Sequence, residues 1–247
     1  MFICTNCSNK LINFKNFLLC NKCKNEFPLN TAGIPIFLKE FSCNDEKLES
    51  KKRTFENSKL YDLNVSIKYW ITKDKKVIED NNFFNNKSLL NVGCGPNPTH
   101  QNLEYNVDQL RNIHCCDTSE NYVIAAKNLN IKNSTFSVCS IEKLPFEDNS
   151  FDIVFAGFVF HHTTIDFKKM LNELKRVSKK YVIVFDHVAS KNIIAKFVQN
   201  FQWKNFDKGF QYKDKNEWNE ILNKEKIYNK CTTGIIFKHV FKFCLIK

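Results

Sequence analysis

"SLLNVGCGPNP", residues 88–98, places two glycines within three positions, directly after an apolar run. The whole chain has only six glycines among its 247 residues. Glycine allows a backbone turn with positive φ, and it allows another group to approach the main chain closely. We therefore expect the apolar run to end a buried strand, and we expect Gly93 and Gly95 to form a turn against which a ligand is pressed.

Apolar runs and helical stretches alternate along the chain after this turn. The runs are rich in β-branched and aromatic residues, as strands are; they are HCC at 114–116, STFSVCS at 134–140, FDIVFAGFVF at 151–160 and YVIVFDHV at 181–188. Helical stretches such as FKKMLNELKRVS, at 167–178, separate them. Strands that alternate with helices form a parallel sheet with helices on both faces. We therefore predict an α/β fold with a Rossmann-like, doubly wound, mostly parallel sheet.

A carboxylate follows the second strand of this predicted sheet. Asp117 lies 22 residues beyond Gly95, close to the offset of ~20 residues at which an acidic residue accepts hydrogen bonds from ribose hydroxyls. Thr118 or Ser119 is a good N-cap for the helix that comes next. Asp108, in YNVDQL, is the alternative. We favour Asp117 because it follows the better strand and precedes the better-capped helix.

The turn differs from that of a dinucleotide-binding protein. A G-x-G-x-x-G motif would need a glycine at position 98, where this chain has proline. Proline has no backbone N–H to donate to a pyrophosphate. The turn therefore suits a ligand without phosphates.

Composition and charge favour a globular protein with a solvated surface. The apolar fraction is 43% and the net charge is +11, distributed as +4 over residues 1–60, zero over 61–190 and +7 over 191–247. The longest apolar run, at 151–160, is far shorter than the ~20 residues that span a bilayer. The start of the chain, MFICTNC, resembles no signal peptide. We expect no membrane span and a cytoplasmic location.

Two cysteine pairs precede this region. CTNC contains Cys4 and Cys7, CNKC contains Cys20 and Cys23, and twelve residues that can form a short hairpin separate the pairs. Four thiolates at one point suit a structural zinc ion, which would supply the folding energy that so small a segment lacks. We predict a zinc ribbon over residues 1–40 with a core separate from that of the sheet; four unrelated buried thiols are the alternative.

Residues 41–85 are predicted to be a linker followed by helices. Residues 42–60 are charged, whereas apolar residues recur at helical spacing from Tyr61 to Phe84. Tyr61, Tyr69 and Trp70 are candidates for a lid over the site, and packing in the core is an equally good interpretation.

A further motif identifies a family. LPFEDNSFDIV, residues 144–154, is followed by a histidine pair at His161 and His162. Together with LLNVGCGP and CCDTSE, it makes residues 86–190 resemble the class I S-adenosylmethionine-dependent methyltransferases, in particular the group with an LPF-x-D-x-SFD signature. Many members also carry an N-terminal four-cysteine ribbon that ends in GIP, as residues 33–35 do here.

The resemblance implies S-adenosylmethionine as cofactor and a sheet of seven strands over residues 86–247. The two glycines would let the methionine part of the cofactor pass over the turn, Asp117 would hold the ribose hydroxyls, and Thr118 would flank the adenine. The residues expected to contact the cofactor are Asn91, Gly93, Cys94, Gly95, Asp117, Thr118, Ser140 and Ile141.

Three positions depart from the family pattern. Asn91 stands where an acidic residue is usual, so it can hydrogen-bond the amino-acid part of the cofactor without offsetting its ammonium charge. Asn97 replaces a third glycine, and asparagine tolerates the left-handed region. Ser140 stands where an aspartate normally accepts from the adenine amino group.

In the same fold, the segment before the last helix and strands often covers the substrate. Here that segment is 191–217, and residues 218–247 would supply the last helix and two strands. The segment contains six aromatic residues, which would form either a wall of the site or the core of a helix: Phe197, Phe201, Trp203, Phe206, Phe210 and Tyr212.

Methyl transfer is an in-line displacement in which the protein mainly positions the reactants. An oxygen nucleophile can need a base, and His161 or His162 is the first candidate for it, although either one can instead be a packing residue. Asp186 and His187, at the end of the next strand, form a second candidate pair.

Three functions fit these features. The first is a methyltransferase that acts on a small molecule or on a glycan or lipid precursor. The second is an rRNA or tRNA methyltransferase whose ribbon recognises RNA; the basic ends of the chain favour it and the neutral middle disfavours it. The third is a non-catalytic, methyltransferase-like binding module, suggested by the departures at Asn91, Asn97 and Ser140.

Overall fold

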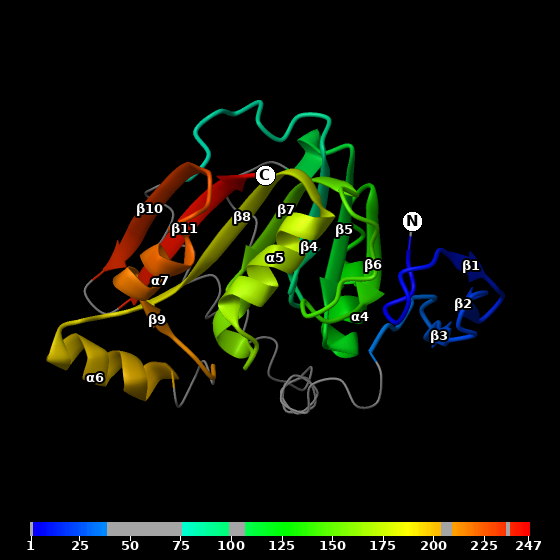
Figure 1. Cartoon of the computed structure of the whole chain (residues 1–247), viewed down its shortest axis with the longest axis horizontal. Coiled ribbons are helices and arrows are strands. Elements are labelled where there is room, and N and C mark those ends of the chain that lie inside the picture. The colour runs from blue at the N-terminus through cyan, green and yellow to red at the C-terminus, as the bar shows by residue number, and fades with distance from the viewer. Residues whose placement is uncertain (1, 39–75, 99–106, 204–208, 236–237) are drawn as a thin grey trace.

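The structure, a computed structural model, describes residues 2–38, 76–98, 107–203, 209–235 and 238–247. They form a small three-stranded sheet near the N-terminus and a large central sheet flanked by helices (Figure 1). Among these residues, none of the helices has the length and apolar character needed to cross a bilayer.

The central sheet has the strand order β10-β11-β8-β7-β4-β5-β6. Neighbouring strands from β6 to β8 are parallel, whereas β11 runs antiparallel to both β8 and β10. These strands are β4 (Ser88–Val92), β5 (Asn112–Asp117), β6 (Ser134–Val138), β7 (Phe151–Gly157), β8 (Ser178–Ala189), β10 (Ile227–Ile235) and β11 (Lys238–Ile246). The predicted mostly parallel, seven-stranded α/β sheet is confirmed. An additional two-residue strand, β9 (Lys213–Asp214), pairs with the end of β8.

Helices cover both faces of this sheet. Along β4, Leu89 belongs to one buried cluster together with Val123, whereas Leu90 belongs to the other together with Leu174. Successive strand residues point to opposite faces, so α4 and α5 cover different sides. The helical elements are η2 (Val107–Gln109), α4 (Glu120–Asn128), η3 (Phe160–His162), α5 (Phe167–Val177), α6 (Ile193–Gln202) and α7 (Lys215–Ile221). Ser119 caps α4 as predicted, because its side chain accepts a hydrogen bond from the Tyr122 amide.

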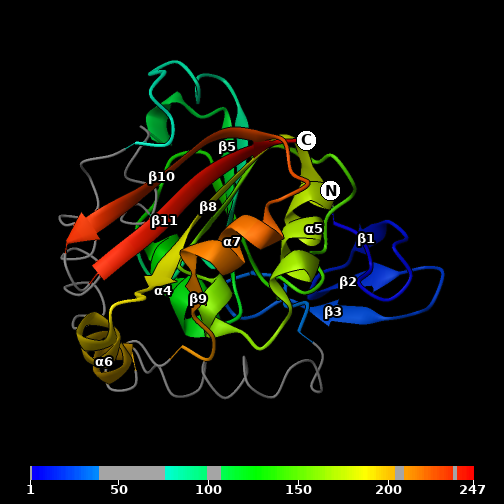
Figure 2. The same ribbon diagram turned by 60° about the vertical axis from the view of Figure 1, so that its left-hand side comes forward.

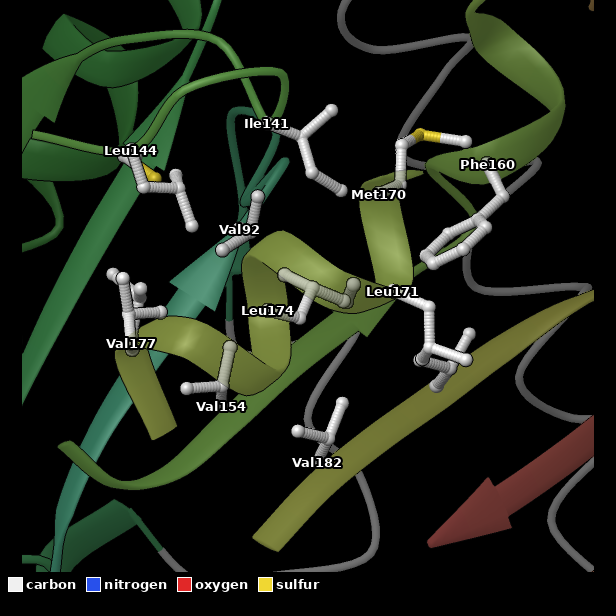
Figure 3. Close-up of a cluster of buried hydrophobic side chains, with 14 of the residues drawn as sticks. Val92, Ile141, Leu144, Val154, Phe160, Met170, Leu171, Leu174, Val177 and Val182 are labelled. Atoms are coloured by element: carbon white, nitrogen blue, oxygen red, sulfur yellow. The ribbon is translucent and has the colours of Figure 1, made fainter. Parts of the chain in front are cut away.

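Helix α5 fixes the middle of the sheet. Leu171 and Leu174 lie over the valines of three neighbouring strands, Val92, Val154 and Val182 (Figure 3). All five side chains are buried, and full burial of such a side chain stabilises the fold by about 1.5–3 kcal/mol. This packing holds β4, β7 and β8 together under one helix.

The N-terminal sheet is a ribbon that covers the edge of the central sheet. Strands β1 (Leu11–Asn13), β2 (Phe17–Cys20) and β3 (Glu26–Pro28) are antiparallel, which confirms the predicted hairpin between the cysteine pairs. The chain then pairs with β6, where the Phe37 amide donates to the Val138 carbonyl at 2.8 Å. An edge strand offers unpaired backbone groups, and here the ribbon satisfies some of them.

The ribbon shares a core with the central sheet, so the expectation of separate cores was wrong. Phe2 packs against Phe37 and against Phe146, the residue that ends the LPF motif, with ring centroids 5.0 and 5.5 Å apart. The Ile3 amide donates to the Pro145 carbonyl at 2.9 Å. The ring of His114 lies beside Phe2, and burial lowers the pKa of His114 to about 3. This histidine therefore stays neutral at the junction.

The described residues include only the last part, 76–84, of the helix predicted from Tyr61 to Phe84. Residues 61–75, with the lid candidates Tyr61, Tyr69 and Trp70, lie outside the described residues. From 76 to 80 the chain is irregular and from 81 it forms turns, so there is no helix between 76 and 84, which corrects that part of the prediction. The Asn82 amide donates to the Asp80 carboxylate at 2.8 Å, and such Asp and Asn turns compete with a helix. The apolar residues of this stretch are nevertheless buried in the core.

Candidate functional site

The glycine turn is anchored to the neighbouring strand. Gly93 and Gly95 have φ angles of 65° and 62°, in the left-handed region that favours glycine. The Gly95 amide donates to the Asp117 carboxylate at 2.9 Å, and the Cys94 amide donates to the Cys116 carbonyl at 3.0 Å. The turn after β4 and the end of β5 therefore form one unit.

Asp117, and not Asp108, lies beside this turn. One carboxylate oxygen of Asp117 accepts from Gly95 and the other accepts from the Ser119 amide at 2.9 Å. Each oxygen can accept a second hydrogen bond, and the residue is only half-buried. Asp108 lies in η2, which precedes β5 and is hydrogen-bonded to the chain before β4 through Gln109. It is therefore at the opposite end of these strands.

Asn91 presents a buried amide at the end of β4. Its side chain is fully buried, and neither its oxygen nor its nitrogen has a hydrogen-bond partner among the residues that the structure describes. Leaving a buried polar group without a partner costs about 1–3 kcal/mol. A ligand with both a donor and an acceptor, placed at the turn, would satisfy this amide. The amino and carboxylate groups of an amino acid provide that combination.

A third strand end completes this side of the site. The Cys139 amide donates to the Asp117 carbonyl at 3.0 Å, which brings the chain after β6 next to β5. The Ser140 hydroxyl accepts from the Glu142 amide at 3.1 Å, and Ile141 is buried beside it. Thr118 is half-buried directly after Asp117. Thr118, Ser140 and Ile141 thus lie at the same edge as the glycine turn.

Cys94 and Asn97, two other residues of this turn, have structural roles. Cys94 is buried, and the Cys115 thiol together with burial raises the pKa of Cys94 well above its usual range. It is a neutral packing group that reaches the turn through its main chain. Asn97 does not have a positive φ angle, so its replacement of a glycine introduces no backbone strain.

The loop after β7 is pressed against the glycine turn. A Cβ atom at Gly93 would lie only 2.3 Å from Cγ2 of Val159, so the close approach requires glycine there. The preceding residue, Phe158, has a φ angle of 60°, and a bulky side chain rarely adopts this conformation. Strained residues of this kind cluster at functional sites. The sequence contains no local signal for this strain.

The two histidine-containing pairs proposed from the sequence form one cluster. His161 Nδ1 hydrogen-bonds the Asp186 carboxylate, and both side chains are 1% exposed. The His187 amide donates to the same carboxylate at 2.6 Å. The His161 ring contacts His162, His187 and Tyr212, with centroids 4.1, 4.8 and 5.1 Å away. The sequence alone does not pair these residues, because Asp186 lies 25 positions after His161 along the chain.

Segment 191–217 supplies one wall of this histidine cluster. Trp203 stacks on Tyr212 with ring centroids 3.7 Å apart, and the Phe210 amide donates to the His161 carbonyl at 2.7 Å. The interpretation as helix core is wrong for Phe197 and Phe201, which are exposed. Phe206 lies outside the described residues.

The four ribbon cysteines converge on one point. Their sulfur atoms all lie within 4.8 Å of one another, close to the ~3.8 Å spacing in a tetrahedron with Zn–S bonds of ~2.3 Å. The same turn occurs twice: the Ser8 amide donates to the Cys4 carbonyl, and the Lys24 amide donates to the Cys20 carbonyl, both at 2.8 Å. This repeat brings the two cysteine pairs face to face.

Residues 90–185 match the family model described as a methyltransferase domain. The likeness to this family concerns this segment of the chain. The segment contains the glycine turn, Asp117 and the loop with His161, whereas Asp186 and His187 follow it directly. The match agrees with the class I S-adenosylmethionine-dependent methyltransferases that the sequence resembles, and no curated protein matches the chain.

Solved structures of methyltransferases share the fold of this chain. An S-adenosylmethionine-dependent methyltransferase from Aquifex aeolicus has a TM-score of 0.55 at 22% identity, covering 78% of this chain and 99% of its own. YcgJ from Bacillus subtilis has a TM-score of 0.54 at 16% identity, covering 66% and 92%. A chain from the complex between the Haloferax volcanii Trm112 methyltransferase activator and a methyltransferase has a TM-score of 0.61 at 14% identity, covering 76% and 94%. At these identities the likeness concerns the fold.

We predict that Gly93→Ala destabilises the protein more than Gly33→Ala does. Both glycines have positive φ angles, but a Cβ at Gly33 has nothing within 4 Å. Gly33→Ala should cost about 1–2 kcal/mol of backbone strain, and Gly93→Ala should cost a further 1–3 kcal/mol, roughly, from overpacking against Val159. Urea unfolding measures both. Val159→Ala should recover part of the loss in Gly93→Ala; equal costs for the two glycines would contradict the contact.

Proposed function

We propose that this protein is an S-adenosylmethionine-dependent methyltransferase that acts on a small molecule or on a glycan or lipid precursor. The hydrogen bond between Gly95 and Asp117 supports this most directly, because it places a carboxylate beside a glycine turn at the carboxyl ends of two adjacent parallel strands. Ligands of such sheets bind at that edge.

The residues at this edge fit the parts of the cofactor. Asp117 can accept hydrogen bonds from two ribose hydroxyls, and the Asn91 amide can bind the amino-acid part. The main chain of residues 93–95 would lie against the methionine part, while Thr118, Ser140 and Ile141 would flank the adenine. When bound, S-adenosylmethionine supplies a methyl group on a positively charged sulfur that leaves as a neutral thioether.

His161 is the proposed base for the methyl acceptor. Its Nδ1–H donates to Asp186, which orients the ring and makes Nε2 the nitrogen with a lone pair. The acceptor atom would attack the methyl group in line, and His161 would take the proton that this atom loses. His162 is half-buried against His161 and would line the path to it.

The surroundings of His161 support a small acceptor over an RNA. Among the described residues, those that contact the His161 ring include Asp186, His162, His187 and Tyr212. RNA binding depends on lysine and arginine contacts to phosphates, and none of these four contacts of the His161 ring is a lysine or an arginine. The departures at Asn91 and Asn97 do not support a non-catalytic module, because one offers a buried amide to a ligand and the other adds no strain.

We further propose that Cys4, Cys7, Cys20 and Cys23 bind one zinc ion. All four positions of the tetrahedron would be taken by protein, so the ion would be structural. Because the ribbon shares its core with the central sheet, the metal would stabilise the domain edge as well as the ribbon.

We predict that Asp117→Ala lowers the affinity for S-adenosylhomocysteine at least 100-fold, because two hydrogen bonds to a charged group, at about 1.5–3 kcal/mol each, are lost. Asp108→Ala is the matched control and should change the affinity less than twofold. Isothermal titration calorimetry measures both constants. Loss of binding in Asp108→Ala with retention in Asp117→Ala would move the ribose site and refute the assignment.

For the acceptor step, we expect His161→Gln to slow methyl transfer by about 10²–10⁴-fold. The affinity for S-adenosylhomocysteine should stay within twofold of the wild type, since the ring acts on the acceptor. Asp186→Asn should slow the reaction in the same way by disturbing the tautomer of His161. A full loss of activity in His162→Gln with an active His161→Gln would assign the base to His162.

For the metal, elemental analysis of protein purified without chelator should find about one zinc per chain. Cys20→Ser should lose the zinc and unfold at lower temperature in a single transition, because ribbon and sheet share a core. Cys231→Ser, which changes a half-buried cysteine outside the ribbon, should keep the zinc. Zinc-free wild-type protein of unchanged melting temperature would disprove the site.

A further inference from the structure

Helix α6 turns its apolar side to the solvent. Ile193 and Ile194 are 85% and 72% exposed, and Phe197 and Phe201 are 75% and 60% exposed. At 3.6 residues per turn these four positions fall on one side of the helix; we call this side the α6 face. A surface helix normally packs such a side against the core, so the α6 face is the reverse of the usual arrangement.

Polar contacts on the opposite side fix this orientation. Gln199 is 1% exposed; its side-chain nitrogen donates to the Val188 carbonyl at 3.1 Å, and its oxygen accepts from the Ser190 amide at 2.7 Å. Asn192 caps the helix by accepting from the Ala195 amide at 3.1 Å. The helix is therefore held to the end of β8 through its polar side, and its large apolar residues point away.

We propose that the α6 face docks on the surface of an anionic lipid bilayer. A helix with large apolar side chains on one side and lysines beside them lies in the interface of a membrane, and anionic lipids attract the lysines. Lys191 and Lys196 are exposed at α6 beside these apolar residues, and Lys191 also lies 3.9 Å from the Asp214 carboxylate. This charge complements an anionic surface, whereas a second copy of the chain would bring the same positive charges together.

Helix α6 lies far from the ribbon. The helix lies at the outer margin of the protein in both views, on the side away from the ribbon (Figures 1 and 2). The α6 face and the cysteine cluster are therefore separate features of the molecule.

The α6 face is also continuous with the candidate site. Trp203, the C-cap of α6, stacks on Tyr212, and Tyr212 contacts His161. Docking would place this wall of the site close to the lipid headgroups. The consequence for catalysis rests on the proposed function: the methyl acceptor would be one that is held at the membrane by a lipid tail.

Binding of the full-length protein to vesicles tests the docking surface without using catalysis. We expect co-sedimentation with vesicles of phosphatidylglycerol and phosphatidylcholine, and at least fivefold weaker binding to phosphatidylcholine alone. Phe197→Ser with Phe201→Ser should weaken binding to the mixed vesicles at least tenfold. The matched control is Ile12→Ser with Phe14→Ser, which removes two exposed apolar residues from the ribbon and should change binding less than twofold.

Other results would overturn the proposal. Unchanged vesicle binding in the α6 double variant would show that the α6 face is not the contact. A wild-type dimer that the double variant converts to monomer, with no vesicle binding by either, would assign the face to a second copy. S-adenosylhomocysteine affinity, measured on the same samples, checks that the variants are folded. Because vesicle binding needs no cofactor, its failure is distinct from failure of the methyltransferase assignment.

Discussion

The hydrogen bond from the Gly95 amide to the Asp117 carboxylate joins the ends of β4 and β5, and the candidate site depends on it. Gly95 adopts a positive φ angle in this turn, and its amide points toward the neighbouring strand. The same carboxylate also accepts from Ser119, the N-cap of α4. One side chain therefore holds the glycine turn, the strand end and the start of a helix in a fixed relation.

The loop that carries His161, the proposed base, packs closely against this unit. Gly93 meets Val159 without a Cβ atom between them, and Val159 begins the short helix that carries His161. His161 is in turn tied to Asp186 at the end of β8. The ends of five strands, β4, β5, β6, β7 and β8, thus contribute to the site, and α5 packs over three of these strands, β4, β7 and β8. Displacing the glycine turn would move both the cofactor residues and the proposed base.

The sequence predicts the parts of this arrangement that depend on local pattern. Alternating strands and helices, the glycine turn, the cap at Ser119 and the two cysteine pairs each have a signal within a few residues. Features set by distant contacts have none: the shared core at Phe2 and Phe146, the strained Phe158 and the pairing of His161 with Asp186. The apolar pattern of α6 predicts an amphipathic helix but not whether its apolar side faces the core or the solvent. The buried Gln199, on the opposite side, shows that the apolar side faces the solvent. Turns replace the predicted helix after residue 80, because the Asp80 carboxylate accepts a hydrogen bond from the Asn82 backbone amide.

A crystal structure of the protein with S-adenosylhomocysteine bound tests the central claim most directly. We predict that the ribose hydroxyls lie against the Asp117 carboxylate, that the amino-acid part reaches the Asn91 amide, and that the thioether sulfur faces the cluster of His161 and Tyr212. A ligand bound away from the Gly93–Gly95 turn, or with its ribose on Asp108, would contradict the account.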